Sequence, residues 1–132
     1  MIPARELAAV LVGGLIGTGL RLAIDAAIPH ADDAFPLSTL IVNTIGAGVL
    51  GALVSRFWST APAWLKAALG PGLLGSFTTF SALAVGLVAL AAANDWGTAL
   101  GYLGLTLVLG FGAAFFGLAA GKPTPVPTGD EE

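Results

Sequence analysis

Charged residues divide this chain into long apolar blocks. The blocks cover about residues 7–28, 34–55, 67–94 and 96–121. Each block is long enough to cross the hydrocarbon core of a bilayer, which needs about 20 residues of helix. None of them alternates polar and apolar residues as the strands of a transmembrane barrel do. The pattern predicts an all-α membrane protein with four transmembrane helices, near residues 5–28, 37–57, 65–93 and 96–120.

Composition supports the membrane assignment. Of the 132 residues, 56% are hydrophobic and only 10% are charged, whereas a soluble domain carries about a quarter charged residues. A cleaved signal peptide does not explain the first block, because Arg21 interrupts it and three further spans follow. We expect residues 1–121 to form the transmembrane domain and residues 122–132, which end in "GDEE", to form a disordered tail.

Lysine and arginine are distributed unevenly between the two sides of the predicted membrane. The side shared by both termini carries Arg5, Arg56, Lys66 and Lys122. The opposite side has only Arg21, still within a span, together with Asp25, Asp32, Asp33 and Asp95. Because cytoplasmic loops are enriched in Lys and Arg, we expect a multi-pass protein of the cell (inner or plasma) membrane with both termini in the cytoplasm.

Ionisable residues are scarce within the spans. Only Arg21 and Asp25 lie inside one, both near one end of the first. A proton-coupled small multidrug exporter would need a carboxylate at mid-depth, so passive permeation or no transport fits better. An enzyme is not indicated, because the single His30 lies in a loop and the chain has no cysteine.

Polar residues recur at a spacing of four, which places them on one helix face. The sets are Thr39 with Asn43, Tyr102 with Thr106, and Gly13 and Gly17 with Arg21. Such residues can simply bond between helices, at about 1 kcal/mol or less each. Taken together they favour a path lined by hydrogen-bond donors, because hydroxyl, amide and guanidinium groups can all donate to an anion.

Glycine and proline mark special positions in the spans. Glycines four apart, at 13 and 17, 97 and 101, and 117 and 121, predict close helix contacts within or between chains. In the third block, Pro71 lies among Gly70, Gly72 and Gly75. An interrupted helix is expected there, with a simple kink at Pro71 as the alternative. Broken membrane helices occur where freed backbone groups line a cavity or bind an ion.

Three segments, one in each of the first three predicted helices, resemble a known family. They are "GGLIGTGLR", "STLIVNTIGAGVLG" and "GLLGSFTTFSAL", and they are similar to the signatures of the Fluc (CrcB) fluoride channels. The resemblance covers the whole four-helix chain. It implies an antiparallel dimer in the membrane, two fluoride pores, and a structural sodium ion at the dimer centre.

The resemblance also implies roles for particular residues. Asn43 would be the pore-lining amide, Phe80 a pore phenylalanine, and Arg21 the cation near the vestibule. The backbone carbonyls of Gly75 and Thr78 would hold the sodium ion. The remaining pore-lining positions implied are Thr39, Ser81, Tyr102 and Thr106.

The chain departs from the family pattern at a few positions. Leu83 stands where the family usually has a second pore phenylalanine, Val85 and Gly86 where an acidic residue often follows, and Gly110 where the polar track would continue. These changes indicate that one pore surface has degenerated. The uneven Lys and Arg distribution indicates insertion mainly in one orientation. The partner is then an inverted paralogous subunit, with a homodimer as the alternative. A structural, non-conducting role for this subunit is a further alternative.

Overall fold

A computed structural model describes residues 2–31 and 34–121, and the predicted tail at 122–132 lies outside these described residues. In chain order the elements are α1 (Ala4–Ala27), α2 (Leu37–Phe57), α3 (Ala63–Ala67), a π-helical segment η1 (Ala68–Leu74), α4 (Gly75–Phe77), α5 (Phe80–Ala92) and α6 (Trp96–Ala120). The described part of the chain is all-helical. Four stretches are long and apolar enough to cross a membrane, with α3 to α5 counting as one. This confirms the four predicted helices, whose boundaries differ from the observed ones by at most about two residues.

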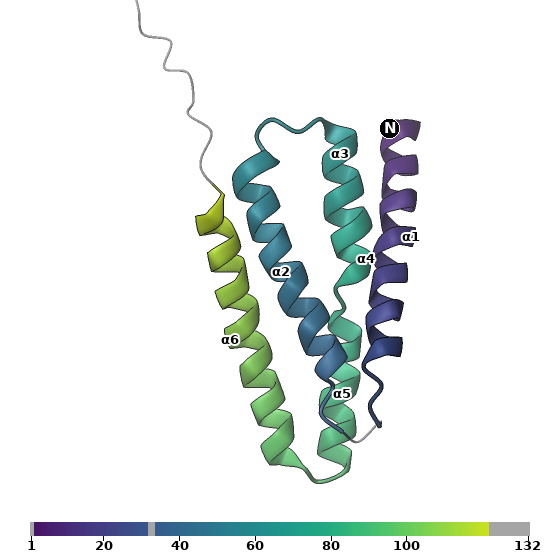
Figure 1. The fold of residues 1–132 in the computed structure, drawn as a ribbon. Helices are drawn as coiled ribbons and strands as arrows, with labels where there is room; N and C mark the ends of the chain where they lie inside the picture. The colour runs from purple at the N-terminus through teal and green to yellow at the C-terminus, as the bar shows by residue number, and fades with distance from the viewer. Residues whose placement is uncertain (1, 32–33, 122–132) are drawn as a thin grey trace, which may run out of the picture.

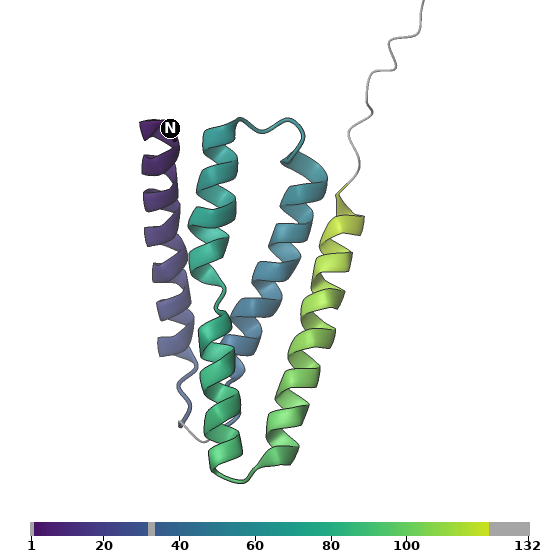
Figure 2. The same cartoon turned by 180° about the vertical axis from the view of Figure 1, so that it is seen from behind.

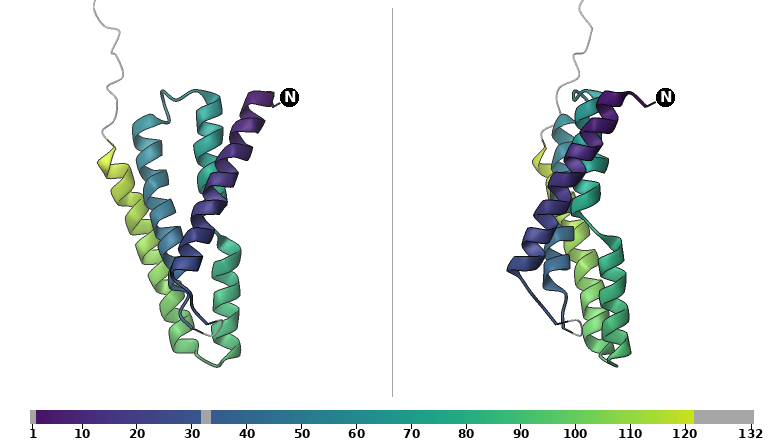
Figure 3. Two further views of the ribbon diagram at one scale, coloured as in Figure 1. Left: turned by 45° about the vertical axis from the view of Figure 1, so that its right-hand side comes forward. Right: turned by 90° about the vertical axis from the view of Figure 1, so that its right-hand side faces the viewer.

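The third span lies between the other helices and packs on two of them. Its first half, from α3 to α4, lies against α1, whereas α5 lies against α6, and α2 packs mainly on α6 (Figure 1). The same order of helices is visible from behind (Figure 2). Figure 3 shows that the two halves of the third span are offset from each other. The start of α1 and the end of α6 lie at the same end of the bundle.

Glycines in α1 bring that helix into backbone contact with the third span. A Cβ atom at Gly13 would collide with the carbonyl oxygen of Ala68, and one at Gly17 with the carbonyl oxygen of Leu73. Small residues allow such close approach in membrane helices, where van der Waals packing replaces the hydrophobic driving force. The predicted contact role of this glycine pair is confirmed.

The last glycine pair has the same role between α2 and α6. A Cβ at Gly117 would collide with the carbonyl oxygen of Gly48, and one at Gly121 with the side chain of Ser55. The middle pair differs, because no atom lies within 4 Å of a Cβ built at Gly101. For Gly101 the prediction of a contact inside this chain is therefore wrong.

The third span is interrupted, but not at its proline. Pro71 lies inside η1, where the wider π-helical winding accommodates a residue without an N–H group. The helix ends later, at Thr78 (φ −77°, ψ 156°) and Thr79 (φ −148°, ψ 118°), both in extended conformation. The predicted interruption is confirmed, whereas the alternative of a simple kink at Pro71 is wrong.

Apolar packing joins α2, α5 and α6 near the end opposite the termini. The core there consists of Leu40, Leu83, Leu90, Ala99 and Tyr102. Gly86 belongs to the same contact region, because a Cβ on it would lie 2.8 Å from Pro36 Cγ and 3.4 Å from Tyr102 Cε1. Leu83 and Gly86, two of the departures from the family pattern, thus have a packing function in this chain.

A tight turn leads into α6. Asn94 adopts a positive φ of 59°, and the Asp95 carboxylate accepts a hydrogen bond from the Thr98 backbone N–H at 3.1 Å. Hydrogen bonds from Thr98 hold the pKa of Asp95 below its usual value. The stability that this cap contributes is fully present above the ordinary carboxyl pKa. It is lost as the pH falls through the lowered pKa of Asp95 in the folded chain.

Replacement of Gly17 by alanine should destabilise the fold, because the added methyl group meets the fixed carbonyl oxygen of Leu73. Overpacking of this kind costs about 1–3 kcal/mol. Gly19→Ala on the same helix is the matched control, since nothing lies within 4 Å of its Cβ position. Thermal unfolding in detergent micelles should show a lower Tm for Gly17→Ala only. Equal Tm values would contradict the close contact.

Candidate functional site

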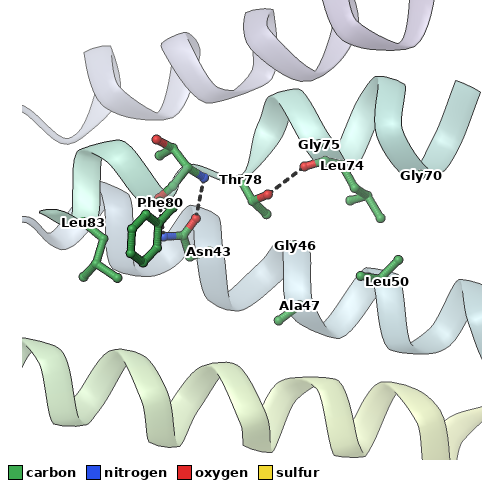
Figure 4. Close-up of a pocket in the computed structure, with 11 residues that line it drawn as sticks. Asn43, Gly46, Ala47, Leu50, Gly70, Leu74, Gly75, Thr78, Phe80 and Leu83 are labelled. Carbon is green, nitrogen blue, oxygen red and sulfur yellow. Dashed lines mark hydrogen bonds between the residues drawn. The ribbon is translucent and has the colours of Figure 1, made fainter. Parts of the chain in front are cut away.

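A pocket of about 470 Å³ opens beside the break in the third span. Residues of α2 and residues from both sides of the break line it, among them Asn43, Gly75, Thr78, Thr79 and Phe80 (Figure 4). Four of these five were expected from the sequence as ion-site or pore residues. The structure therefore brings the expected amide, phenyl ring and backbone carbonyls into one place.

Asn43 is bound to the backbone of the break by two hydrogen bonds. The Thr79 N–H donates to Asn43 Oδ1 at 2.8 Å, and Asn43 Nδ2 donates to the Thr79 carbonyl at 3.0 Å. A backbone N–H can only donate and a carbonyl can only accept, so this pairing fixes the orientation of the amide. The Asn43 side chain thus takes the place of the two backbone groups that Thr79 would pair with in a continuous helix.

The break leaves the last carbonyl oxygens of the first half of the span without α-helical partners, those of Gly75 and Thr78 among them. In an α-helix Gly75 O would accept from the Thr79 N–H, which here donates to Asn43. Thr78 O would accept from the Ala82 N–H, which here donates to Thr79 Oγ1 at 3.1 Å. Within the described residues, neither carbonyl accepts another backbone hydrogen bond outside a helix. Both have therefore lost the partner that a continuous helix would give them.

The break also places two helix ends of opposite polarity next to each other. The first half of the span ends at Phe77 and α5 begins at Phe80. A helix C-terminus carries partial negative charge and favours cations, whereas an N-terminus carries partial positive charge and favours anions. The chain therefore offers a cation-favouring and an anion-favouring end within three residues, beside one pocket.

Phe80 and Ser81 lie at the start of α5 on the open side of the site. The Phe80 side chain is 81% exposed and lines the pocket with Asn43. The Ser81 hydroxyl lies 3.1 Å from the Thr79 hydroxyl. The ring is therefore open to the pocket and is not packed in the core of this chain.

The remaining pore candidates do not line this pocket. Thr39 and Tyr102 are buried where α2 meets α6, with 7% and 0% exposure, and the Tyr102 ring packs edge-on against Phe35 at 5.3 Å. Thr106 lines a second pocket of about 250 Å³ between α2 and α6. Ala47 of α2 lines both pockets, so the two regions lie on neighbouring faces of one helix.

Several buried polar atoms have no hydrogen-bond partner within the described residues. They are Arg21 Nε, Ser38 Oγ, Thr44 Oγ1, Tyr102 Oη and Thr106 Oγ1. An unsatisfied buried polar group costs about 1–3 kcal/mol, so such groups normally bind water, an ion or another chain. Three of these atoms belong to residues that the sequence placed along an anion path.

Two residues of this region were not singled out from the sequence. Thr79 pairs with Asn43 and caps α5 through its hydroxyl. The sequence signal for this role is its place directly before an apolar helical run, because threonine is a common N-cap residue. Ser38 is fully buried, and its position beside Thr39 offered no separate signal.

The described residues hold no group of three or more His, Cys, Asp or Glu side chains that could bind a metal ion. The oxygen atoms at the break belong to the backbone and to neutral side chains. Unwound carbonyls at broken membrane helices bind sodium. The two available carbonyls, Gly75 and Thr78, fit that chemistry.

The fold and the site define a small multi-pass membrane protein with a broken helix whose polar backbone groups face a pocket. Comparison with known proteins identifies the family. The profile of the family described as "CrcB-like protein, Camphor Resistance (CrcB)" matches residues 8–118. This chain belongs to the CrcB family.

Curated relatives cover most of the chain. The fluoride-specific ion channel FluC of Gloeobacter violaceus is 40% identical over 124 residues, which are 89% of this chain and 97% of that protein. FluC 1 of Thermobifida fusca is 40% identical over 83% of this chain and 89% of its own length. FluC 1 of Nocardia farcinica is 36% identical, with 83% and 76% covered.

Thr79→Val should lower the stability of the chain, because valine keeps the shape but cannot accept the hydrogen bond from the Ala82 N–H. Loss of an N-cap costs about 1 kcal/mol. Thr79→Ser keeps the accepting oxygen and serves as the matched control. Unfolding by heat or denaturant in detergent should separate the two variants. If Thr79→Ser is destabilised as much as Thr79→Val, the hydroxyl does not cap α5.

Proposed function

We propose that this chain is a subunit of a passive fluoride channel that releases fluoride from the cytoplasm. The observation that carries the proposal is the broken third span, where Asn43, Phe80 and two free carbonyls border one pocket. Relatives of nearly the same length are named fluoride-specific ion channels. Membership of the CrcB family also removes the multidrug exporter and an enzyme from consideration.

The anion path begins at the break. Asn43 Nδ2 has a second hydrogen beyond the one given to Thr79, and it can donate that hydrogen to fluoride. The edge of the Phe80 ring carries partial positive charge and can face the ion. Ser81 adds a hydroxyl donor. The anion-favouring N-terminus of α5 lies at the same point.

Hydroxyl groups and a guanidinium extend the path away from the break. Thr39, Tyr102 and Thr106 line it along the α2–α6 contact, and Arg21 attracts anions at its entrance. The unpartnered buried atoms of Arg21, Tyr102 and Thr106 support this assignment. Transport is passive because the central parts of the spans contain no ionisable side chain that could carry a proton.

A sodium ion has a structural role in this proposal. The carbonyls of Gly75 and Thr78 would hold it at the end of α4. One chain supplies two oxygens there, whereas hard cations take about six oxygen ligands. A second subunit would supply further ligands, and the bound ion would neutralise the negative helix end and link the two chains.

The subunits would pair in opposite orientations within the lipid bilayer. Arg5, Arg56 and Lys66 lie at the end of the bundle where α1 begins and α6 ends, which we assign to the cytoplasm. A homodimer requires insertion both ways, so this bias favours an inverted paralogous subunit as the partner. The exposed Phe80 ring supports contact with such a partner.

A non-conducting structural subunit is the second candidate. The observation in its favour is Leu83, which is 8% exposed and packs in the core with Leu90 and Tyr102. Leu83 also lines the pocket with Asn43 and Phe80, so an aliphatic side chain stands there in place of a second pore phenylalanine. One pore surface of the dimer would then lack an aromatic wall.

Fluoride efflux from liposomes containing the purified chain, with sodium present, tests the proposal. Phe80→Ala should reduce efflux by about tenfold or more, a change of about 1.4 kcal/mol in the barrier. Val88→Ala on the same helix is the control, because Val88 is 68% exposed and lies outside both described pockets. Chloride efflux should be absent throughout.

The outcomes separate the candidates. Efflux from the chain alone that depends on Phe80 indicates a self-sufficient dimer. No efflux alone, with efflux after an inverted paralogue is added, indicates a heterodimer. Absence of efflux in both preparations, or efflux that Phe80→Ala leaves unchanged, would contradict the conducting role. Tags at both ends report orientation, and equal populations would contradict the one-way insertion.

A further inference from the structure

We propose that Asn43 is the positioning residue of the cation site: it keeps the third span broken and thereby keeps the Gly75 and Thr78 carbonyls free. This inference rests on the proposed sodium site. It gives Asn43 a function separate from contact with fluoride. The channel's anion path and its structural cation site would then depend on the same side chain.

The local sequence does not explain the break. Residues 76–85, "SFTTFSALAV", contain neither glycine nor proline. Their intrinsic cost in a helix is small, about 0.7 kcal/mol or less for each residue. Pro71 lies seven residues before Thr78, inside a helical segment. The one local feature that favours a break is the N-cap at Thr79, which is worth about 1 kcal/mol. We attribute the rest to a contact from elsewhere in the chain.

Asn43 is the contact that fits this requirement. It binds both the N–H and the carbonyl of Thr79, the two groups that a continuous helix would pair with Gly75 and Leu83. Without Asn43, the Thr79 N–H would return to the Gly75 carbonyl and close the helix. That carbonyl would then no longer be available to a cation.

A glycine one turn along α2 allows this contact. A Cβ atom at Gly46 would collide with Thr78 Cγ2, so only glycine lets α2 approach the break closely enough. The Thr78 hydroxyl in turn donates to the Leu74 carbonyl at 2.8 Å. The side chain of Thr78 is thereby held on the helix side while its own carbonyl stays free.

The test measures sodium-dependent stability of the purified full chain in detergent. The Tm of the wild type should rise as Na⁺ replaces N-methyl-D-glucamine, because a ligand that binds only the folded state stabilises it. Asn43→Ser loses both hydrogen bonds to Thr79. Two such bonds at about 1 kcal/mol each correspond to an increase of about tenfold or more in the sodium concentration at half effect.

A rescue variant distinguishes positioning from general damage. Phe80→Pro places proline at the first residue of α5, where a helix tolerates it, and forces the preceding residue into the extended region that Thr79 already occupies. The double variant Asn43→Ser/Phe80→Pro should therefore recover a sodium response close to that of the wild type. Val88→Ala, at an exposed position of α5 outside both pockets, should leave the sodium response unchanged.

Two results would overturn the inference while leaving the cation site in place. One is an Asn43→Ser variant that keeps the wild-type sodium response while its fluoride efflux falls, which would restrict Asn43 to the anion path. The other is a double variant that folds but is not rescued. A wild type without any sodium response would overturn the cation site and this inference together. Fluoride efflux from liposomes that contain the same purified chain then reports separately on the channel function.

Discussion

The pairing of the Asn43 amide with the backbone of Thr79 is the interaction on which the arrangement of this protein depends. It pairs both backbone groups of Thr79 at the break, which matters because unpaired backbone groups at membrane depth are costly. It also leaves two neighbouring carbonyls free and separates two helix ends of opposite polarity. In the proposed channel, these helix ends are the adjacent places for a cation and an anion in an otherwise apolar span.

The surrounding bundle makes this pairing possible through close backbone contacts. Gly13 and Gly17 hold the first half of the third span against α1, while α5 packs on α6. Because the two halves pack on different helices, the span can be offset at its centre. Gly46 completes the arrangement by letting α2 reach the break. The glycine content of the chain is thus a requirement of its geometry.

The sequence predicted the four spans and the interruption, because hydropathy and the positions of charged residues, glycine and proline are local properties. The place of the break was not predictable from Pro71, since a contact with Asn43, 36 residues away, determines it. The packing functions of Leu83 and Gly86 were also hidden, because they depend on Tyr102 and Pro36 from other segments. The spacing of residues along the chain did not indicate that Asn43, Phe80 and the carbonyls lie together. That expectation came from the family resemblance.

The central claim is that the break presents the Gly75 and Thr78 carbonyls to a cation. Solid-state NMR of the chain in lipid, with carbonyl-¹³C labels at both positions and at Leu90 in the intact part of α5, tests it directly. On exchange of N-methyl-D-glucamine for Na⁺, we expect the Gly75 and Thr78 resonances to shift and the Leu90 resonance to stay. Unchanged resonances at both labelled break positions would contradict the account.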